Sequence, residues 1–123
     1  MQAAIEYVQQ WGVSQIRQHE QELVAHALNR LVEEPDVTVY GPSQASKRTG
    51  VVSFDLEGVH PHDVAQILDE TGIAVRAGHH CTQVLHERLG VRATVRLSMA
   101  LYNTLEEIDR AISALANVRK VFL

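Results

Sequence analysis

The apolar positions of the chain follow a helical period at both ends and a strand period in between. Residues 3–11 (AAIEYVQQW) predict a short helix that ends at Gly12, and Ser14 is expected to cap a longer helix through Val32. Pro35 ends this second helix, because proline lacks the backbone donor and clashes with the preceding turn. The apolar residues of the second helix recur at the spacing of one face: Ile16, Leu23, Ala27, Leu28 and Leu31.

The middle of the chain alternates short strands with helices. VTVY (37–40) and VVSFDL (51–56) predict two strands joined by a polar loop, and IAVR (73–76) predicts a short buried third strand. The segment 60–72 (HPHDVAQILDETG) carries the signals of a helix, with proline at the first position, an aspartate in the first turn and glycine after the end.

The last part of the chain predicts a helix, a strand and a final helix. TQVLHERLG (82–90) is a short helix ended by its glycine, and TVRLSMA (94–100) is a strand that turns Arg96 away from the core. Three alternate residues of this strand face the core: Val95, Leu97 and Met99. Thr104 and Glu107 form a capping box for the final helix. The order α-α-β-β-α-β-α-β-α predicts an α+β fold, a small, mostly antiparallel sheet covered by helices.

Length and composition indicate one globular domain, because 123 residues are 46% hydrophobic and 21% charged, with no repeat or linker. No stretch approaches the roughly 20 apolar residues of a membrane span. Residues 1–20 lack the basic start and apolar run of a signal peptide. A single cysteine allows no internal disulfide and favours a reducing compartment, so we expect a cytoplasmic protein. The net charge of −4 argues against nucleic acid as the main partner.

Positive charge gathers around the single cysteine, Cys81, which lies in RAGHHCTQ (76–83). Residues 76–96 contain four arginines against one glutamate, a net charge of +3, so the remainder of the chain carries −7. Neighbouring cations favour the thiolate, which is the reactive form of cysteine, and they also favour an anionic ligand.

Four roles for Cys81 are open on the residues alone: metal ligand, disulfide partner, buried packing residue or reactive nucleophile. Adjacent His79, His80 and Cys81 cannot all reach one ion from a regular backbone, although His79, Cys81 and His86 could form a three-ligand set. Burial is common for free cysteine, but the flanking glycine, histidine and threonine are typical of a loop. The setting favours the nucleophile, and we assign no metal site.

The string RAGHHCTQ, followed by LG…ATVRLSMALYNT, resembles the C-terminal region of class II (SUF-type) cysteine desulfurases, which are pyridoxal-phosphate enzymes of aminotransferase class V. The resemblance extends over essentially the whole chain, including VYGP and VVSFDLEGVHPHDVAQILDETGIAVRAGHHC. Two departures lie beside the motif. CTQVL stands at 81–85 where CAQPL is frequent, and LSMA at 97–100 where ASF is common, so acceptor or substrate preference is open.

The resemblance implies an enzyme that converts L-cysteine to L-alanine and passes the sulfur, as a persulfide on Cys81, to an acceptor protein of the SUF system for iron–sulfur cluster assembly. Arg96 matches the arginine that holds the substrate α-carboxylate, and Arg76 matches a second arginine of the active site. The full-length enzyme is expected to be a homodimer. Two alternatives are a selenocysteine lyase of the same family and a non-enzymatic domain that carries persulfide sulfur or docks a partner.

The cofactor implied by the resemblance needs a lysine. The chain has two, Lys47 in a polar loop and Lys120 near its end, and neither has the His-Lys setting of the family. We therefore expect residues 1–123 to be the small C-terminal domain of a longer enzyme of fold type I. On this expectation the large domain lies outside this sequence, and the isolated chain does not bind pyridoxal phosphate tightly.

Overall fold

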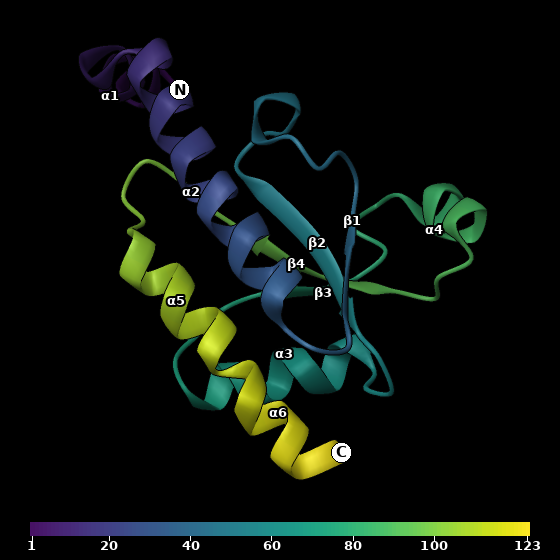
Figure 1. Ribbon diagram of the computed structural model, residues 1–123. Helices are drawn as coiled ribbons and strands as arrows, with labels where there is room; N and C mark the ends of the chain where they lie inside the picture. The colour runs from purple at the N-terminus through teal and green to yellow at the C-terminus, as the bar shows by residue number, and fades with distance from the viewer.

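The computed structural model describes residues 1–123 and has the predicted α+β fold, whose elements are shown in Figure 1. The helices are α1 (Gln2–Trp11), α2 (Val13–Glu33), α3 (Pro61–Glu70), α4 (Gln83–Leu89), α5 (Leu105–Ser113) and α6 (Leu115–Phe122). The strands are β1 (Val37–Tyr40), β2 (Val51–Leu56), β3 (Arg76–Gly78) and β4 (Thr94–Ser98), and a 3-10 turn, η1 (Ala45–Lys47), lies between β1 and β2.

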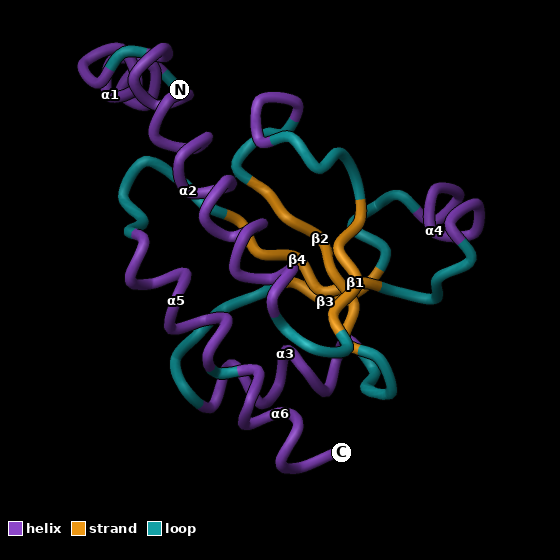
Figure 2. The backbone as a smooth tube through the Cα atoms, viewed as in Figure 1, coloured by secondary structure: helices purple, strands orange, loops and turns teal.

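The four strands form one antiparallel sheet in the order β1-β2-β4-β3 (Figure 2). Val95 of β4 pairs with Phe54 of β2 on one side and with Ala77 of β3 on the other. The two central strands are thus β2 and β4, and the short strand β3 forms an edge. This arrangement brings residues 76–78 beside residues 94–96, two segments that both carry an arginine.

The hydrophobic core fills the space between one face of the sheet and four helices. From the sheet, Val52, Phe54 and Val95 point inward and are at most 1% exposed. Leu56, Val59 and Met99 also belong to this cluster. The helices α2, α3, α5 and α6 add ten large apolar side chains: Leu23, Val24, Leu28, Leu31, Val64, Leu68, Ile108, Ile112, Leu115 and Val118. Each fully buried side chain of this kind stabilises the fold by about 1.5–3 kcal/mol. The opposite face of the sheet is left for polar side chains, among them Arg96.

The loop between β1 and β2 is organised by a buried arginine that the sequence did not single out. Arg48 is 9% exposed, and its guanidinium donates to the backbone carbonyls of Tyr40 and Pro42. Burial lowers the pKa of Arg48, so the carbonyls around it compensate for lost water.

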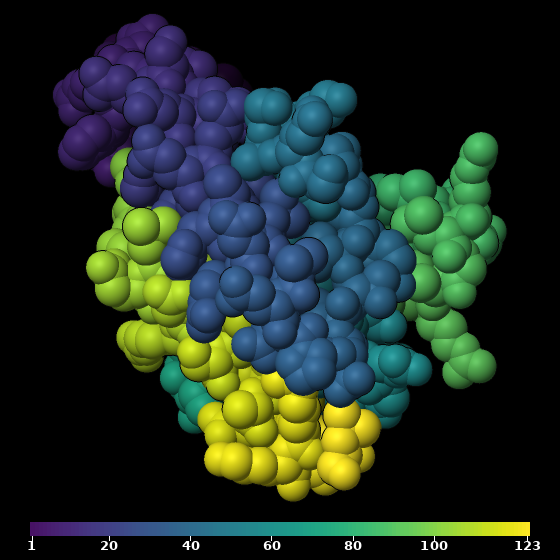
Figure 3. Space-filling model, in the orientation of Figure 1, coloured from purple at the N-terminus to yellow at the C-terminus, as the bar shows by residue number.

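Two helices stand away from this core. Figure 3 shows α1 and the segment around α4 at opposite edges of the molecule. No residue of α1 is buried, and Trp11 remains 51% exposed although its ring meets Tyr7 edge to face. No helix has the length and apolar character needed to cross a membrane.

Several boundaries differ from the sequence prediction: β4, predicted at 94–100, ends at Ser98, and three other differences follow. Ser14 was expected to cap the second helix, but α2 begins at Val13 and Gly12 is its N-cap. The prediction was wrong because Gly12, with a φ of 80°, reverses the chain within one residue, so Ser14 is already helical. The predicted final helix is divided at Ala114 into α5 and α6.

The third boundary concerns the strand before Cys81. The sequence predicted a buried strand at 73–76, whereas the ladder covers Arg76–Gly78 and its residues are exposed or half-buried. Periodicity could not show this shift, because the register is fixed by β4, whose Arg96, Val95 and Thr94 pair with residues 76, 77 and 78. The shift extends the sheet almost to Cys81.

Candidate functional site

Cys81 lies on the turn that connects β3 to α4, and its side chain is exposed. The turn is closed by Thr82, whose backbone N–H and hydroxyl both donate to the carbonyl of His79, at 2.8 and 2.7 Å. His80 and Cys81 both have positive φ angles, 53° and 65°. This conformation costs roughly 1–2 kcal/mol for each residue with a side chain. The exposure contradicts a packing role for Cys81, and the strained backbone projects its thiol into solvent.

Arg76 approaches the thiol from the start of β3. Its Nη2 lies 3.7 Å from Cys81 Sγ. Arg76 also pairs directly across the ladder with Arg96, whose Nε donates to Ser98 Oγ at 3.0 Å. Neither arginine forms an ion pair with a carboxylate. Two guanidinium groups without a carboxylate partner beside an exposed thiol can receive an anion, such as the carboxylate of a small substrate.

Of the three histidines near Cys81, His80 and His86 contact Thr94 of the sheet, whereas His79 is exposed. His80 Nε2 lies 3.0 Å from Thr94 Oγ1, and the buried His86 places its Nε2 3.1 Å from the same oxygen. Burial lowers the pKa of His80, and the positive charges of Arg96 and Arg76 lower it further. His79 is exposed and meets the ring of His86 edge to face.

Sequence reasoning missed Thr94, which is 2% exposed although it points away from the apolar core. The one available signal was a β-branched residue with a hydroxyl on the polar face of the strand that carries Arg96. The strand pattern alone could not show that two histidines from outside this strand would meet that hydroxyl.

The structure does not assemble the metal set considered for His79, Cys81 and His86. No group of three or more histidine, cysteine, aspartate or glutamate side chains is arranged to hold a metal ion. Both ring nitrogens of His86 already face protein oxygens, since Nδ1 lies 3.0 Å from the carbonyl of Thr82. The other histidine pair lies at the start of α3, where His60 Nδ1 accepts from the backbone N–H of His62.

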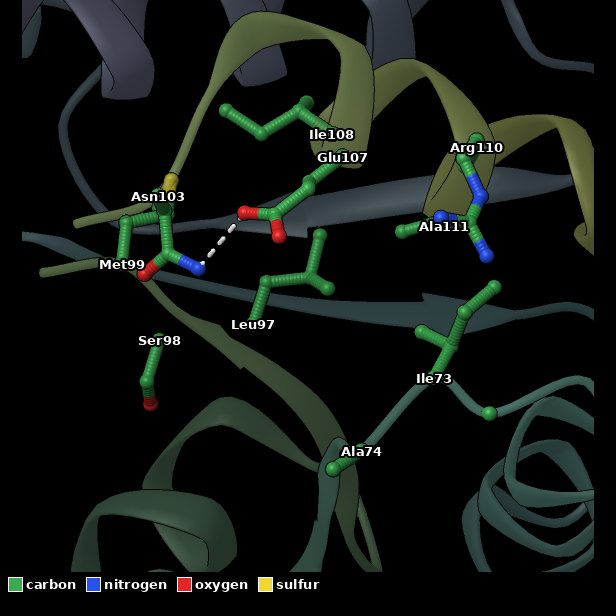
Figure 4. Close-up of a pocket in the computed structure, with 11 residues that line it drawn as sticks. Ile73, Ala74, Leu97, Ser98, Met99, Asn103, Glu107, Ile108, Arg110 and Ala111 are labelled. Atoms are coloured by element: carbon green, nitrogen blue, oxygen red, sulfur yellow. Dashed lines mark hydrogen bonds between the residues drawn. The ribbon is translucent and has the colours of Figure 1, made fainter.

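The two lysines of the chain lie on its surface. Lys47 in η1 and Lys120 in α6 are both exposed, so neither amine is held in a pocket. A cavity of about 240 Å³ lies between residues 72–74, β4 and α5 (Figure 4), and no lysine lines it. Its polar groups include Asn103, which donates to Glu107 at 2.9 Å, and Cys81 is not part of it.

Comparison with known proteins shows similarity to cysteine desulfurases. Residues 1–111 match the family model for aminotransferase class-V. The chain is 51% identical over 120 residues to a probable cysteine desulfurase of Halalkalibacterium halodurans, covering 98% of this chain and 29% of the relative. It is 44% identical to a cysteine desulfurase of Haloferax volcanii, covering 98% of this chain and 28% of that relative.

Solved structures agree with this result. The apo structure of cysteine desulfurase from Thermococcus onnurineus NA1 superposes with a TM-score of 0.91 at 41% identity, covering 98% of this chain and 30% of that one. The cysteine desulfurase CsdA from Escherichia coli gives 0.88 at 30% identity, covering 98% and 29%. This chain therefore spans less than a third of the length of these relatives, and its fold matches the C-terminal part of the desulfurase structures. It belongs to the aminotransferase class-V family of pyridoxal-phosphate enzymes and is homologous over 98% of its length to cysteine desulfurases.

Proposed function

We propose that this chain is the small C-terminal domain of a longer pyridoxal-phosphate-dependent cysteine desulfurase, and that Cys81 is the thiol that takes sulfur from L-cysteine. The observation that carries the proposal is the exposed Cys81 thiol, held in a turn with the Arg76 guanidinium 3.7 Å away. The names of the relatives support the reaction class. The share of those relatives that the chain spans supports its place as one domain.

The reaction assigned to this chain is a sulfur transfer. The thiolate of Cys81 attacks the sulfur of substrate cysteine, an S–S bond forms and the Cβ–S bond of the substrate breaks. The electron pair of the broken bond stays on carbon, and a proton completes the methyl group of alanine. Cysteine plus thiol thus gives alanine plus persulfide, with no outside oxidant. The electron-sink chemistry belongs to the cofactor and hence to residues outside this chain.

Arg96 is proposed to bind the α-carboxylate of the substrate. Its side chain lies on the sheet face opposite the core, and its Nε is held by Ser98, so the two terminal nitrogens remain for both carboxylate oxygens. Arg76 is proposed to face the reacting sulfur, since it contacts the thiol itself. A planar guanidinium suits the binding of a carboxylate better than an ammonium group, because it can hold both oxygens at once.

The exposed position of Cys81 suits the second half of the proposal, transfer of the persulfide sulfur to an acceptor protein of the SUF system. We propose a cytoplasmic homodimer for the longer enzyme. One observation favours a second candidate, a persulfide carrier that works without the cofactor: both lysines of the chain are exposed and outside the cavity.

The test uses the longer enzyme with Cys81→Ser and Arg96→Ala. Cys81→Ser should abolish alanine formation and the persulfide adduct in mass spectra while the cofactor absorbance is kept. Arg96→Ala should weaken cysteine binding by about 30- to 1,000-fold, since a lost bidentate charged contact costs about 2–4 kcal/mol. Arg92→Ala, an exposed arginine of the same basic segment, is the matched control.

Full turnover by the Cys81→Ser enzyme would contradict the proposal. An equal loss of cofactor and substrate binding in Arg96→Ala would show a folding defect in place of a substrate contact. Stable persulfide on the 123-residue chain alone, formed from a small persulfide donor and passed to a second thiol, would favour the carrier.

A further inference from the structure

The hydroxyl of Thr94 lies between two histidines, His80 from the turn after β3 and His86 from α4. His80 Nε2 is 3.0 Å and His86 Nε2 is 3.1 Å from Thr94 Oγ1. Thr94 itself is buried in β4, where it pairs with Gly78 of β3. The sheet therefore fixes the oxygen, and the turn and α4 are both tied to it.

The direction of these hydrogen bonds follows from the contact between His86 and the backbone carbonyl of Thr82. His86 Nδ1 lies 3.0 Å from the carbonyl of Thr82 and 3.4 Å from its hydroxyl, whose proton is donated to the carbonyl of His79. Both oxygens therefore accept, and Nδ1 carries the proton. In the neutral ring Nε2 then accepts, and the Thr94 hydroxyl donates to it. The Thr94 oxygen accepts in turn from His80, whose proton must lie on Nε2. The order is His80 to Thr94 to His86 to the Thr82 carbonyl.

The other ring nitrogen of His80 supports this order. His80 Nδ1 is buried and has no hydrogen-bond partner. A bare nitrogen tolerates that position better than an N–H group would, because an unpaired buried donor loses its water without compensation. The two histidines are thus fixed as opposite tautomers, His80 with its proton on Nε2 and His86 with its proton on Nδ1.

The hydrogen-bond network holds the backbone on both sides of Cys81, where the φ angles are positive. His80 and Cys81 have φ angles of 53° and 65°, and the residues held by the network are His80 on one side and Thr82 on the other. Strain of this kind persists only where the surroundings over-determine it. Cys81 is the one residue between these two anchors, and its conformation decides whether Sγ faces Arg76.

We propose that Thr94 is a positioning residue for Cys81: its hydroxyl, held between His80 and His86, locks the turn that keeps the thiol in front of Arg76. The link to catalysis rests on the proposed function of Cys81, but the network and its effect on the thiol do not. Both are measurable on this chain without cofactor or turnover.

The first measurement is the tautomer pair, by long-range ¹H–¹⁵N correlation of the imidazole rings in the 123-residue chain. The expected spectrum shows His80 protonated at Nε2 and His86 protonated at Nδ1. The reverse assignment for either ring, or rapid tautomer exchange in both, would overturn the proposal. This measurement uses the unchanged chain, so no substitution can disturb its folding.

The second measurement is the ratio of Cys81 alkylation rates with iodoacetate and iodoacetamide at low salt. Arg76 favours the anionic reagent while it faces the thiol, and the ratio corrects for general exposure. Arg76→Gln gives the lower reference value of this ratio. We expect it to be about fivefold below the ratio of the parent chain, because one unit charge near 4 Å in water contributes about 1 kcal/mol. Thr94→Val should fall toward that reference, whereas Thr94→Ser, which keeps the hydroxyl, should stay near the parent.

Two controls separate positioning from loss of stability. Thr38→Val removes an exposed strand hydroxyl, and Val118→Ala weakens the core far from the turn, so both should leave the ratio unchanged. If Thr94→Val does not fold, His80→Phe removes the hydrogen bond between His80 and Thr94 from its other end and should also lower the ratio. A Thr94→Val ratio equal to the parent value, or an equal fall in Thr94→Ser, would overturn the proposal.

Discussion

At the scale of single residues, Arg76 and Arg96 stand opposite each other in the ladder between β3 and β4, and neither has a carboxylate partner. Like charges at directly opposite positions of an antiparallel pair destabilise it. A fold selected for stability alone would place an acid at one of these positions. The pair is therefore best explained by an anion that neutralises it, in agreement with the proposed carboxylate of the substrate.

We predict that Arg96→Gln raises the free energy of unfolding of this chain at low salt by about 0.2–1 kcal/mol, because it removes the repulsion with Arg76. The gain should shrink at high salt, where exposed charges are screened. Urea denaturation of both chains at two salt concentrations measures it. Arg92→Gln, which changes the net charge equally outside the ladder, should gain less. A salt-independent effect would show that repulsion is not its cause.

Sequence reasoning at this scale selected Cys81, Arg76 and Arg96 as candidate site residues, but not Thr94. The local string RAGHHCTQ and its charge are visible in the chain itself, and loop residues beside a thiol predict exposure. The role of Thr94 depends on which histidine nitrogens meet its hydroxyl, and this follows from the path of the turn and of α4 relative to β4. No pattern within one segment contains that information.

At the scale of elements, the structure confirms predictions that depend on a few neighbouring residues. The capping box of α5 is present as predicted, since Thr104 Oγ1 accepts from the backbone N–H of Glu107, and the Glu107 carboxylate accepts from the backbone N–H of Thr104. The bounds of β3 were wrong, because a three-residue edge strand is fixed by its partner in the sheet. Capping is decided within four residues, whereas pairing is decided across the whole fold.

We predict that Thr104→Ala lowers the free energy of unfolding by about 1 kcal/mol, the usual cost of a lost N-cap. The orphan N–H of Glu107 would lose its acceptor at the start of α5. Thr104→Ser should keep most of the stability, and Ser113→Ala, an exposed position of the same helix, should change little. Urea denaturation compares the three variants. Equal stability of Thr104→Ala and Ser113→Ala would contradict the assigned cap.

At the scale of the whole molecule, the fold separates two tasks between the faces of one sheet. One face and four helices hold the apolar cluster, while the other face carries Arg96 and leads to the Cys81 turn. This division was predictable from the alternation of apolar and polar residues in 94–100. The edge order of the strands was not, because several orders bury the same residues equally well.

Two sets of groups set the expected pH dependence of stability. Burial, together with Arg96 and Arg76, lowers the pKa of His80 in the folded chain. Hydrogen bonds lower the pKa of three carboxyls on α5, Glu106, Glu107 and Asp109, and nearby cations add to this effect at Glu107 and Asp109. In both sets the unfolded chain binds protons more readily than the folded one, so each contribution is present at higher pH and is lost as pH falls.

We therefore predict that the free energy of unfolding falls in two steps on acidification. The first begins below about pH 6.5, where an unfolded histidine takes up its proton, and the second below about pH 4.5, where unfolded carboxyls do. Asp55 acts in the opposite direction, because burial raises its pKa and protonation then favours the folded chain, so it reduces the second step. Urea denaturation across this pH range, at constant ionic strength, resolves the steps.

His80→Gln should remove the first step and leave the second, since the amide can still donate to Thr94 but does not titrate. Asp109→Asn should reduce the second step and leave the first, because Asp109 gains its low pKa mainly from the hydrogen bond with His26. His62→Gln, which replaces an exposed histidine at the start of α3, is the matched control and should keep both steps. A first step that survives His80→Gln unchanged would mean that another group titrates there. In that case the buried network around Thr94 would not limit the acid stability of the Cys81 turn.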